Sequence, residues 1–366
     1  MRVLVSTIDY PPPPGGIQTV AKNLSDGINK IGHSSKVLYE NGEKSRYKFR
    51  HYIPHTKFLY SRSSFMDRHF VYDKYLHEKT EKEIKEYNPD IIHAMHIRNW
   101  GSLIAARESM IPSVLSVHSM ELQNKALARC AINIADGVHC PSKFTEGLVN
   151  EIDPNAKTYV VPPSINIGLY GRERNENEKN YVMCMARMVE RKNIDVVIKA
   201  WDIINSSRNN NYELLIVGDG PQRDYLTSLA EEIDRVRFTG WVSEKEKREL
   251  LAGAKAFVLV PTRSGYDTEG FGIVFLEARA SNTPIVGSKC GGVPEAINGD
   301  GILVDDENSP IQVANQLKKI MIRINENKTP KLEKEELYKY EIDNISMEHI
   351  DEYKNIVKSN NYKKGY

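Results

Sequence analysis

Residues 212–221 read Tyr212-Glu-Leu-Leu-Ile-Val-Gly-Asp-Gly-Pro221 and give the clearest indication of the fold class. Its apolar residues up to Val217 predict a short buried strand, and Gly218 to Pro221 predicts a turn. The residues from Gln222 to Ile233 then follow a helical pattern. A strand, a glycine turn and a helix in that order form one repeating unit of an α/β fold.

The same order of elements recurs on both sides of this unit. Further strands are predicted at residues 181–186, 236–239, 256–260, 284–286 and 302–304, and further helices at 195–204, 244–252 and 271–280. Buried strands that alternate with helices indicate a parallel sheet covered on both faces. The second half of the chain is therefore predicted to be a doubly wound domain.

The first half shows the same alternation. Strands are predicted at residues 2–8, 37–39, 90–93, 113–117 and 137–140, and helices at 17–31, 78–87, 102–108 and 143–149. The polar residues Gly171 to Asn180 predict a linker. We therefore expect one Rossmann-like domain at 1–170, a second at 181–330, and a helical tail at 331–366 that packs back toward the first domain.

Composition is that of an ordinary soluble globular protein, with 40% apolar residues, 27% charged residues and a net charge of +1. A net charge this close to zero gives no overall electrostatic attraction for nucleic acid, so no nucleic-acid partner is expected. The four cysteines form no C-x-x-C pair, which predicts buried free thiols in a reducing compartment. No segment approaches the roughly 18 to 20 apolar residues of a membrane span. We expect a cytoplasmic protein, either free or peripheral at the inner membrane face.

Two glutamates frame a glycine turn in Glu269-Gly-Phe-Gly-Ile-Val-Phe-Leu-Glu277. Gly270 and Gly272 allow the backbone to approach a ligand closely. The N–H groups of the first helical turn can then face an anion or an electron-rich oxygen. Glu277, deeper in the helix, can accept hydrogen bonds from vicinal hydroxyls such as those of a ribose. The alternative is a capped amphipathic helix whose glutamates are only solvated.

A basic loop, Ala186-Arg-Met-Val-Glu-Arg-Lys-Asn193, follows the first predicted strand of the second domain. In doubly wound folds, ligands bind at the carboxyl ends of the strands. The forked guanidinium of Arg187 and the ammonium of Lys192 suit a diphosphate. A solvated basic loop is the alternative, and Arg191 fits that alternative best.

Two weaker signals lie in the first half. Gly15-Gly16 follows the first strand and precedes a helix, so its amides could hold a phosphate or a sugar, or simply form a tight turn. His118 ends a buried strand, where active-site residues are often found, although a lone histidine can also be structural.

The chain contains no Asp-x-Asp sequence. Enzymes that hold a nucleotide diphosphate through a divalent metal usually need such paired oxygen ligands. If a diphosphate binds here, Arg187 and Lys192 must neutralise it instead. The adjacent Asp305-Asp306 pair is predicted to lie on the surface, and no metal ligand is assigned.

Taken together, these residues resemble the retaining GT-B glycosyltransferases of family 4. Glu269 to Glu277 matches that family's E-x7-E motif, its most specific element, and Arg187 and Lys192 match its diphosphate-binding pair. Further matching stretches are Tyr10-Pro-Pro-Pro-Pro-Gly-Gly-Ile17, Ala135-Asp-Gly-Val-His-Cys-Pro-Ser142, Val160-Val-Pro-Pro-Ser-Ile-Asn166, Ile216-Val-Gly-Asp-Gly-Pro221 and Thr283-Pro-Ile-Val-Gly-Ser-Lys-Cys-Gly-Gly-Val-Pro-Glu295. The resemblance runs through nearly the whole chain. It implies a GT-B fold, in which two Rossmann-like doubly wound α/β domains face a central cleft, with the acceptor side first and the nucleotide-sugar domain second.

The resemblance also implies roles for single residues. Glu277 would hold the ribose hydroxyls, and His118 would touch the donor sugar beside the reacting carbon. Glu269 would hold the donor sugar together with three backbone positions, Phe271, Gly272 and Ile273.

For the rest of the donor, the resemblance implies that the diphosphate rests on Arg187, Lys192 and the amide of Gly16. Gly15 and Gly218 would belong to donor-binding turns, and Val242, next to Trp241, would lie near the base. No metal and no cofactor are implied beyond the nucleotide-diphosphate sugar, which is a co-substrate.

Residues 44–75 carry eight Lys/Arg, two Asp and nine aromatic residues, a local net charge of +6. This stretch can bind an anionic acceptor or an anionic membrane, where each basic residue contributes about 1 kcal/mol. The alternative is a folded segment whose aromatics are core and whose charges are solvated.

The expected function is transfer of a hexosyl unit, with retention, from a nucleotide-diphosphate sugar to a glycan or lipid-linked acceptor. One alternative is a nucleotide-sugar epimerase, or a phosphorylase, on the same architecture. Such enzymes would be expected to carry other acid–base groups or a pyridoxal-binding lysine, for which we find no candidate. A catalytically silent scaffold subunit is the other alternative. It would be expected to lose His118, Lys192 or a glutamate of the pair, all of which are present.

Overall fold

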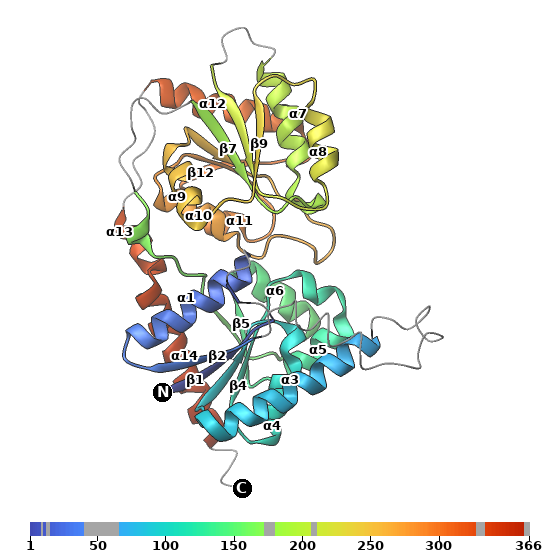
Figure 1. Cartoon of the computed structure of the whole chain (residues 1–366), viewed down its shortest axis with the longest axis vertical. Helices are drawn as coiled ribbons and strands as arrows, with labels where there is room; N and C mark the ends of the chain where they lie inside the picture. Colours follow the sequence, from blue (N-terminus) through green and yellow to red (C-terminus); the bar gives the residue numbers. More distant parts are fainter. Residues whose placement is uncertain are drawn as a thin grey trace. The chain divides into compact units, whose positions relative to one another are not determined.

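The structure, a computed structural model, describes residues 1–8, 10–11, 15–39, 66–171, 180–205, 211–326 and 334–361. The chain divides into two compact units, Met1–Ser164 with Tyr340–Tyr366, and Ile165–Lys339 (Figure 1). Residues 44–65 of the basic and aromatic stretch lie outside the described residues, as do residues 172–179 of the expected linker. The predictions for these segments stay predictions.

The first unit is built on a parallel six-stranded sheet. Its strands are β1 (Arg2–Ser6), β2 (Ser34–Leu38), β3 (Ile91–Ala94), β4 (Ser113–Ser116), β5 (Gly137–Cys140) and β6 (Thr158–Val160), in the order β2-β1-β3-β4-β5-β6. Its helices are α1 (Gly16–Lys30), α3 (Met66–Tyr87), η1 (Ile97–Asn99), α4 (Trp100–Glu108), η2 (Met120–Gln123), α5 (Lys125–Ile134), α6 (Lys143–Ile152), η5 (Tyr338–Tyr340, at the unit boundary) and α14 (Ile342–Asn361). Helix α1 packs against α14, while α3 packs on α4 and α4 on α5.

The second unit contains another parallel six-stranded sheet. Its strands are β7 (Tyr181–Met185), β8 (Glu213–Val217), β9 (Val236–Gly240), β10 (Ala256–Val258), β11 (Ile285–Ser288) and β12 (Gly301–Val304), in the order β12-β11-β10-β7-β8-β9. Its helices are η3 (Ile167–Leu169), η4 (Glu190–Lys192), α7 (Ile194–Asn205), α8 (Arg223–Ala230), α9 (Glu244–Gly253), α10 (Ile273–Ala280), α11 (Val293–Ile297), α12 (Pro310–Asn325) and α13 (Lys334–Leu337). Helix α7 packs against α8 and α12, and α10 against α9 and α11.

Successive residues of a strand point to opposite faces of its sheet, and both faces of the first sheet are buried. In β1, Val3 and Val5 join a cluster that also contains Leu24 of α1. Leu4, between them, joins a different cluster with Leu76 of α3. The sheet is therefore covered on both sides, which confirms the predicted α/β class.

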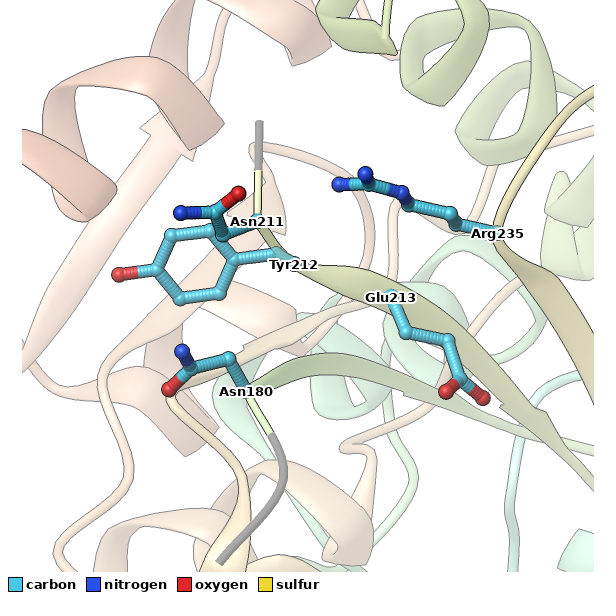
Figure 2. A pocket seen from close by; sticks show the side chains of 5 residues that line it. All are labelled: Asn180, Asn211, Tyr212, Glu213 and Arg235. Atoms are coloured by element: carbon cyan, nitrogen blue, oxygen red, sulfur yellow. The ribbon is translucent and has the colours of Figure 1, made fainter. Parts of the chain in front are cut away.

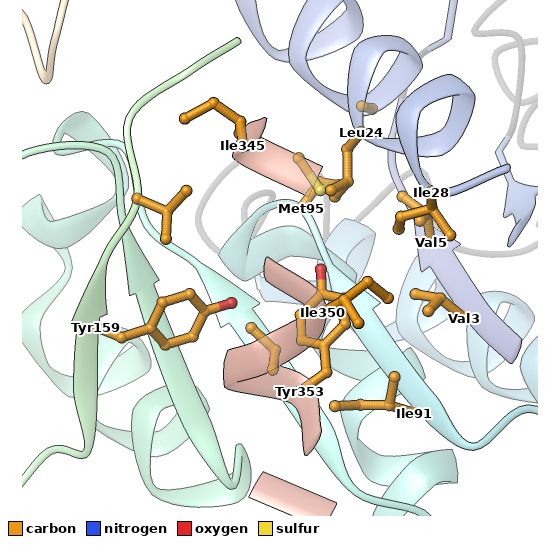
Figure 3. Packing of buried hydrophobic residues seen from close by; sticks show 13 residues of the cluster. Val3, Val5, Leu24, Ile28, Ile91, Met95, Tyr159, Ile345, Ile350 and Tyr353 are labelled. Carbon is orange, nitrogen blue, oxygen red and sulfur yellow. The ribbon is translucent and has the colours of Figure 1, made fainter. Parts of the chain in front are cut away.

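The last long helix, α14, completes the core of the first unit. Figure 3 shows Ile350 and Tyr353 of this helix between Tyr159 on one side and Ile91 on the other. Tyr353 is fully buried. The C-terminal residues thus supply part of the hydrophobic core of a unit whose sheet begins at residue 2.

The structure corrects several details of the predicted elements. Helix α3 begins at Met66, well before the predicted residue 78, and helices α5, α11 and α12 were not predicted. A signal for α12 was present, since Ser309 caps the helix and Pro310 occupies its first turn. The expectation of buried thiols is wrong for Cys130, which is exposed, while the other three cysteines are buried.

Candidate active site at the carboxyl ends of the second sheet

The strand order of the second sheet reverses beside its first strand. Strands β8 and β9 lie on one side of β7, while β10, β11 and β12 lie on the other. In doubly wound folds, ligands bind where the order reverses, at the carboxyl ends of the strands. Lys192 follows β7 and Glu269 follows β10, so the crossover brings these two residues together at that point.

The Lys192 ammonium donates a hydrogen bond to Oε2 of Glu269, and Nη1 of Arg191 donates to the same oxygen at 3.1 Å. Both members of the Lys192–Glu269 ion pair are largely buried, with side chains 11% and 14% exposed. Burial by itself raises the pKa of Glu269, but the charges of Lys192 and Arg191 outweigh it and lower that pKa to about 2. The pKa of Lys192 is lowered, because burial outweighs the attraction of Glu269. The network is thus a charged, desolvated cluster.

Arg191 belongs to this network, which corrects its assignment to the solvated loop. Its Nε lies 3.2 Å from Oδ1 of Asp267, and its side chain is only 25% exposed. Arg191 therefore bridges Asp267 and Glu269. Sequence spacing could not show this, because the partners lie on loops after two strands that only the crossover makes neighbours.

The second glutamate, Glu277, is held by a separate set of donors. Its Oε1 accepts hydrogen bonds from Nζ of Lys247 at 2.6 Å and from Oη of Tyr170 at 3.1 Å. The Glu277 side chain is 4% exposed, so the alternative of a merely solvated glutamate is wrong for this residue. Sequence analysis missed Lys247 and Tyr170, which come from α9 and from the segment that follows η3.

Between the two glutamates, the chain turns sharply into α10. Gly272 is the N-cap residue and has φ 89°, a value that side-chain-bearing residues rarely adopt. A Cβ at this position would lie 2.7 Å from Cδ2 of Phe275. Phe271 is buried, and Ile273 begins the helix, so the backbone groups predicted to hold a sugar lie at the N-terminus of α10.

Gly218 has a structural role that the sequence did not reveal. Its φ is 121°, and a Cβ there would lie 2.1 Å from the carbonyl oxygen of Ala186. The turn after β8 therefore presses against the backbone that leads into Arg187.

The Arg187 side chain is exposed and has no ion-pair partner among the described residues, while Lys192 is paired. Val242, next to the exposed Trp241, lies in the short connection between β9 and α9.

The remaining predicted site residues belong to the first unit. Gly15 caps α1 and Gly16 begins it; α1 is the first helix after β1, the strand at which the order of the first sheet also reverses. Nε2 of His118 lies 2.9 Å from the carbonyl oxygen of Met95, and its backbone N–H donates to Oε1 of Glu121 at 2.8 Å. If Nε2 carries the proton, Nδ1 is left as an acceptor without a partner among the described residues.

A cavity of about 350 Å³ lies at the other edge of the second sheet (Figure 2). Its lining residues are Asn180, Asn211, Tyr212, Glu213 and Arg235. These residues stand at or just before the starts of β7, β8 and β9. The cavity is therefore separate from the carboxyl ends that carry Lys192, Glu269 and Glu277.

The described residues contain one group of side chains with the spacing of metal ligands, and none of their helices has the character of a membrane span. One group of side chains, His77, Glu81 and Glu108, has ligand atoms within 4.8 Å of one another. It lies on α3 and α4 of the first unit. Among the helices described, none has the length and apolar character needed to cross a membrane.

Comparison with known proteins assigns both halves of the chain. Residues 14–169 match the family model for glycosyltransferase family 4, and residues 171–335 match the model for glycosyl transferases group 1. Over 325 residues the chain is 26% identical to the alpha-monoglucosyldiacylglycerol synthase of Streptococcus pneumoniae, covering 78% of this chain and 70% of that protein.

A second relative is the GDP-mannose-dependent alpha-(1-6)-phosphatidylinositol monomannoside mannosyltransferase of Mycobacterium tuberculosis, 34% identical over 206 residues. That match covers 51% of this chain and 53% of the relative, so it spans about half of each protein.

Solved structures establish the fold. Anabaena HepE, in complex with UDP and glucose, superposes with a TM-score of 0.72 at 19% identity, covering 97% of this chain and 100% of HepE. Sucrose-phosphate synthase from Thermosynechococcus elongatus gives a TM-score of 0.76 at 18% identity, covering 98% of this chain and 99% of that one.

Two parallel six-stranded sheets, each covered by helices, are the architecture of the GT-B class of glycosyltransferases, and the family models and the similar solved structures agree with it. The chain belongs to this class, with a family 4 first half and a group 1 second half.

Proposed function

We propose that this protein is a retaining glycosyltransferase that moves a hexosyl unit from a nucleotide-diphosphate sugar to a lipid-linked or glycan acceptor without a metal ion. The observation that carries the proposal is the Lys192–Glu269 ion pair at the reversal point of the second sheet, with Glu277 on the helix that follows. Cationic and anionic groups are thereby placed where such folds bind their ligands.

The charges of the site suit a nucleotide-diphosphate sugar. Lys192 and the exposed Arg187 supply positive charge for the diphosphate, and Glu277 accepts hydrogen bonds from the ribose. Glu269, ionised and buried, accepts from hydroxyls of the donor sugar, with the α10 N-terminus beside it. The sequence contains no Asp-x-Asp pair, which favours neutralisation by these cations. Roles for His118, Gly15 and Gly16 stay predictions from the family resemblance.

In the reaction proposed, the bond between the anomeric carbon and the diphosphate oxygen breaks, and a bond from the acceptor oxygen forms on the same face. The leaving phosphate takes the acceptor's proton, which keeps the charges balanced. The main electrostatic requirement is then to stabilise the departing diphosphate, and a preorganised cation such as Lys192 meets it.

A lipid-linked acceptor is favoured by the relatives. The streptococcal protein is named for a glucosyl diacylglycerol, and the mycobacterial protein for phosphatidylinositol monomannoside and GDP-mannose. UDP is bound in the Anabaena structure. UDP-glucose and GDP-mannose are therefore the first donors to test, with diacylglycerol and phosphatidylinositol monomannoside as first acceptors.

Thermal unfolding with UDP, GDP or ADP, each measured with and without EDTA, tests the site. A ligand at 100 times its dissociation constant adds about 2.7 kcal/mol of stability. A shift with one nucleotide names the base and supports a metal-free diphosphate site, whereas a shift that EDTA abolishes contradicts metal independence. No shift with any nucleotide would favour the silent scaffold.

Product analysis then separates the enzyme classes. Transfer of radiolabelled sugar to a lipid in mixed micelles, with the anomeric configuration read by NMR, is the expected result. An inverted product contradicts retention, and a changed sugar nucleotide without any transfer would indicate an epimerase.

A further inference from the structure

The two oxygens of the Glu277 carboxylate have different surroundings. Oε1 accepts from Nζ of Lys247 at 2.6 Å and from Oη of Tyr170 at 3.1 Å. Oε2 has no hydrogen-bond partner among the described residues. The protein's own donors therefore use one side of this carboxylate and leave the other side available.

Lys247 supplies the positive charge that stabilises the buried carboxylate of Glu277. Its side chain is 13% exposed and that of Glu277 is 4% exposed. Burial by itself lowers the pKa of Lys247, but the charges of Glu277 and Glu244 outweigh burial and raise it. Lys247 thus stays charged, and a second ion pair with Glu244, at 2.8 Å, holds it in place.

Tyr170 is a neutral donor to the same oxygen. Burial and the nearby Glu277 charge raise the pKa of its phenol, so the hydroxyl keeps its proton and donates it in the hydrogen bond. Tyr170 lies directly after η3, in the same compact unit as Glu277.

The start of α9 fixes where Lys247 can reach. Ser243 caps this helix and forms a capping box with Glu246, in which each residue bonds the other's backbone N–H. The connection between β9 and α9, which contains Val242, ends at this cap. Lys247 therefore projects from a first turn that is held by its own hydrogen bonds.

We propose that Lys247 and Tyr170 are positioning residues that hold Oε1 of Glu277, so that Oε2 accepts hydrogen bonds from the ribose hydroxyls of a nucleoside diphosphate. The inference rests on the proposed function and deepens it, because it names the residues that set the preference for ribose. Without Lys247 the buried carboxylate has no cation beside it and is free to turn, since two donors no longer hold the same oxygen.

A ribose comparison tests this inference. The dissociation constants of UDP and 2′-deoxy-UDP, and of GDP and 2′-deoxy-GDP, are measured by calorimetry for wild type, Glu277→Gln, Lys247→Met and Tyr170→Phe. Lys245→Met is the matched control, since Lys245 is on the same helix but its side chain is 81% exposed and pairs with Glu249.

Wild type and Lys245→Met are expected to prefer the ribonucleotide by at least about tenfold, the range of a hydrogen bond to a charged group. Glu277→Gln and Lys247→Met should both lose this preference, with Tyr170→Phe reducing it severalfold. If Lys247→Met weakens both nucleotides equally and keeps the preference, the role of Lys247 is merely structural and the inference is overturned.

The remaining outcomes are also decisive. If Lys247→Met does not fold, Tyr170→Phe provides the test, because this variant removes a single hydroxyl. An unchanged ribose preference in Tyr170→Phe contradicts the inference. A wild-type protein that binds a nucleotide without any ribose preference overturns it too. If wild type binds none of the four nucleotides, the proposed function itself fails, which distinguishes that failure from the failure of the positioning role alone.

Discussion

The Lys192 ammonium and the Glu269 carboxylate form a buried ion pair although 77 residues separate them in sequence. Both groups are expected to contact the donor, one at its diphosphate and one at its sugar. Before the donor binds they neutralise each other, which avoids an unpaired buried charge. In the function proposed above, donor binding exchanges this internal pair for contacts with the ligand.

Replacing Glu269 by Gln is expected to separate binding from turnover. The diphosphate no longer competes with a carboxylate for Lys192, so UDP or GDP should bind severalfold more tightly. Turnover with the intact donor should fall about a hundredfold, because the sugar loses a charged acceptor. Calorimetry with the nucleotide and initial rates with the donor measure the two effects. Equal losses in both would contradict the exchange.

Removal of the Lys192 charge should act mainly on the chemical step. Lys192→Met is expected to lower kcat by about 10² to 10³, as for other groups that stabilise developing charge. Lys199→Met is a suitable control, because Lys199 lies nearby in sequence but pairs with Asp195 at 2.8 Å, and its side chain is 44% exposed. Steady-state kinetics of both variants, with wild-type rates for the control, check the assignment. A wild-type kcat for Lys192→Met would remove it from the site.

Gly218→Ala should destabilise the second unit. The new Cβ would lie 2.1 Å from the carbonyl oxygen of Ala186, and φ is 121° at this position. A strained backbone conformation costs about 1 to 3 kcal/mol, and the steric clash adds to it. Gly16→Ala is the matched control, because a Cβ at Gly16 meets nothing within 4 Å and Ala favours the helix. Urea unfolding should therefore show a loss for the first variant and none for the second.

Acid should destabilise the first unit through three buried histidines, His93, His139 and His349. Ser116 links the first two, with 2.7 Å to Nε2 of His93 and 2.7 Å to Nδ1 of His139, and the His349 ring lies 4.7 Å from that of His139. Burial lowers the pKa of His139 to about 4 and those of the other two well below their usual range.

The lowered pKa values of the three histidines determine how stability changes with pH. Above about pH 6.5 both folded and unfolded chains hold neutral imidazoles, so the histidines do not affect stability. As the pH falls below 6.5, only the unfolded chain takes up protons, and stability is lost. His139 alone contributes a loss of about 3 kcal/mol by pH 4. Urea unfolding between pH 7.5 and 5 measures the slope of stability against pH, which should be shallower in His139→Gln than in wild type. An identical slope in His139→Gln would contradict this account.

The two α/β halves and the Glu269 to Glu277 turn could be predicted from sequence, because strand runs, glycine turns and helix patterns are local properties of the chain. The predicted strand at 137–140 coincides with β5, for example. Helices α5 and α11 were missed; the latter is only five residues long, and short patterns carry little periodic signal. Lys192 and Glu277 were predicted as candidate ligands in the same way, and these roles stay predictions.

Local sequence patterns were enough to predict the class of fold, the paired glutamates and the positions of the charged loops. The contacts of Arg191 with Glu269, and of Lys247 and Tyr170 with Glu277, arise only in the folded chain. For Arg191 and Glu269 the cause is the crossover of the second sheet, which places β10 beside β7 although β8 and β9 lie between them in sequence. Which loops become neighbours, and hence which charges pair, depends on packing of the whole sheet, and no spacing along the chain encodes it.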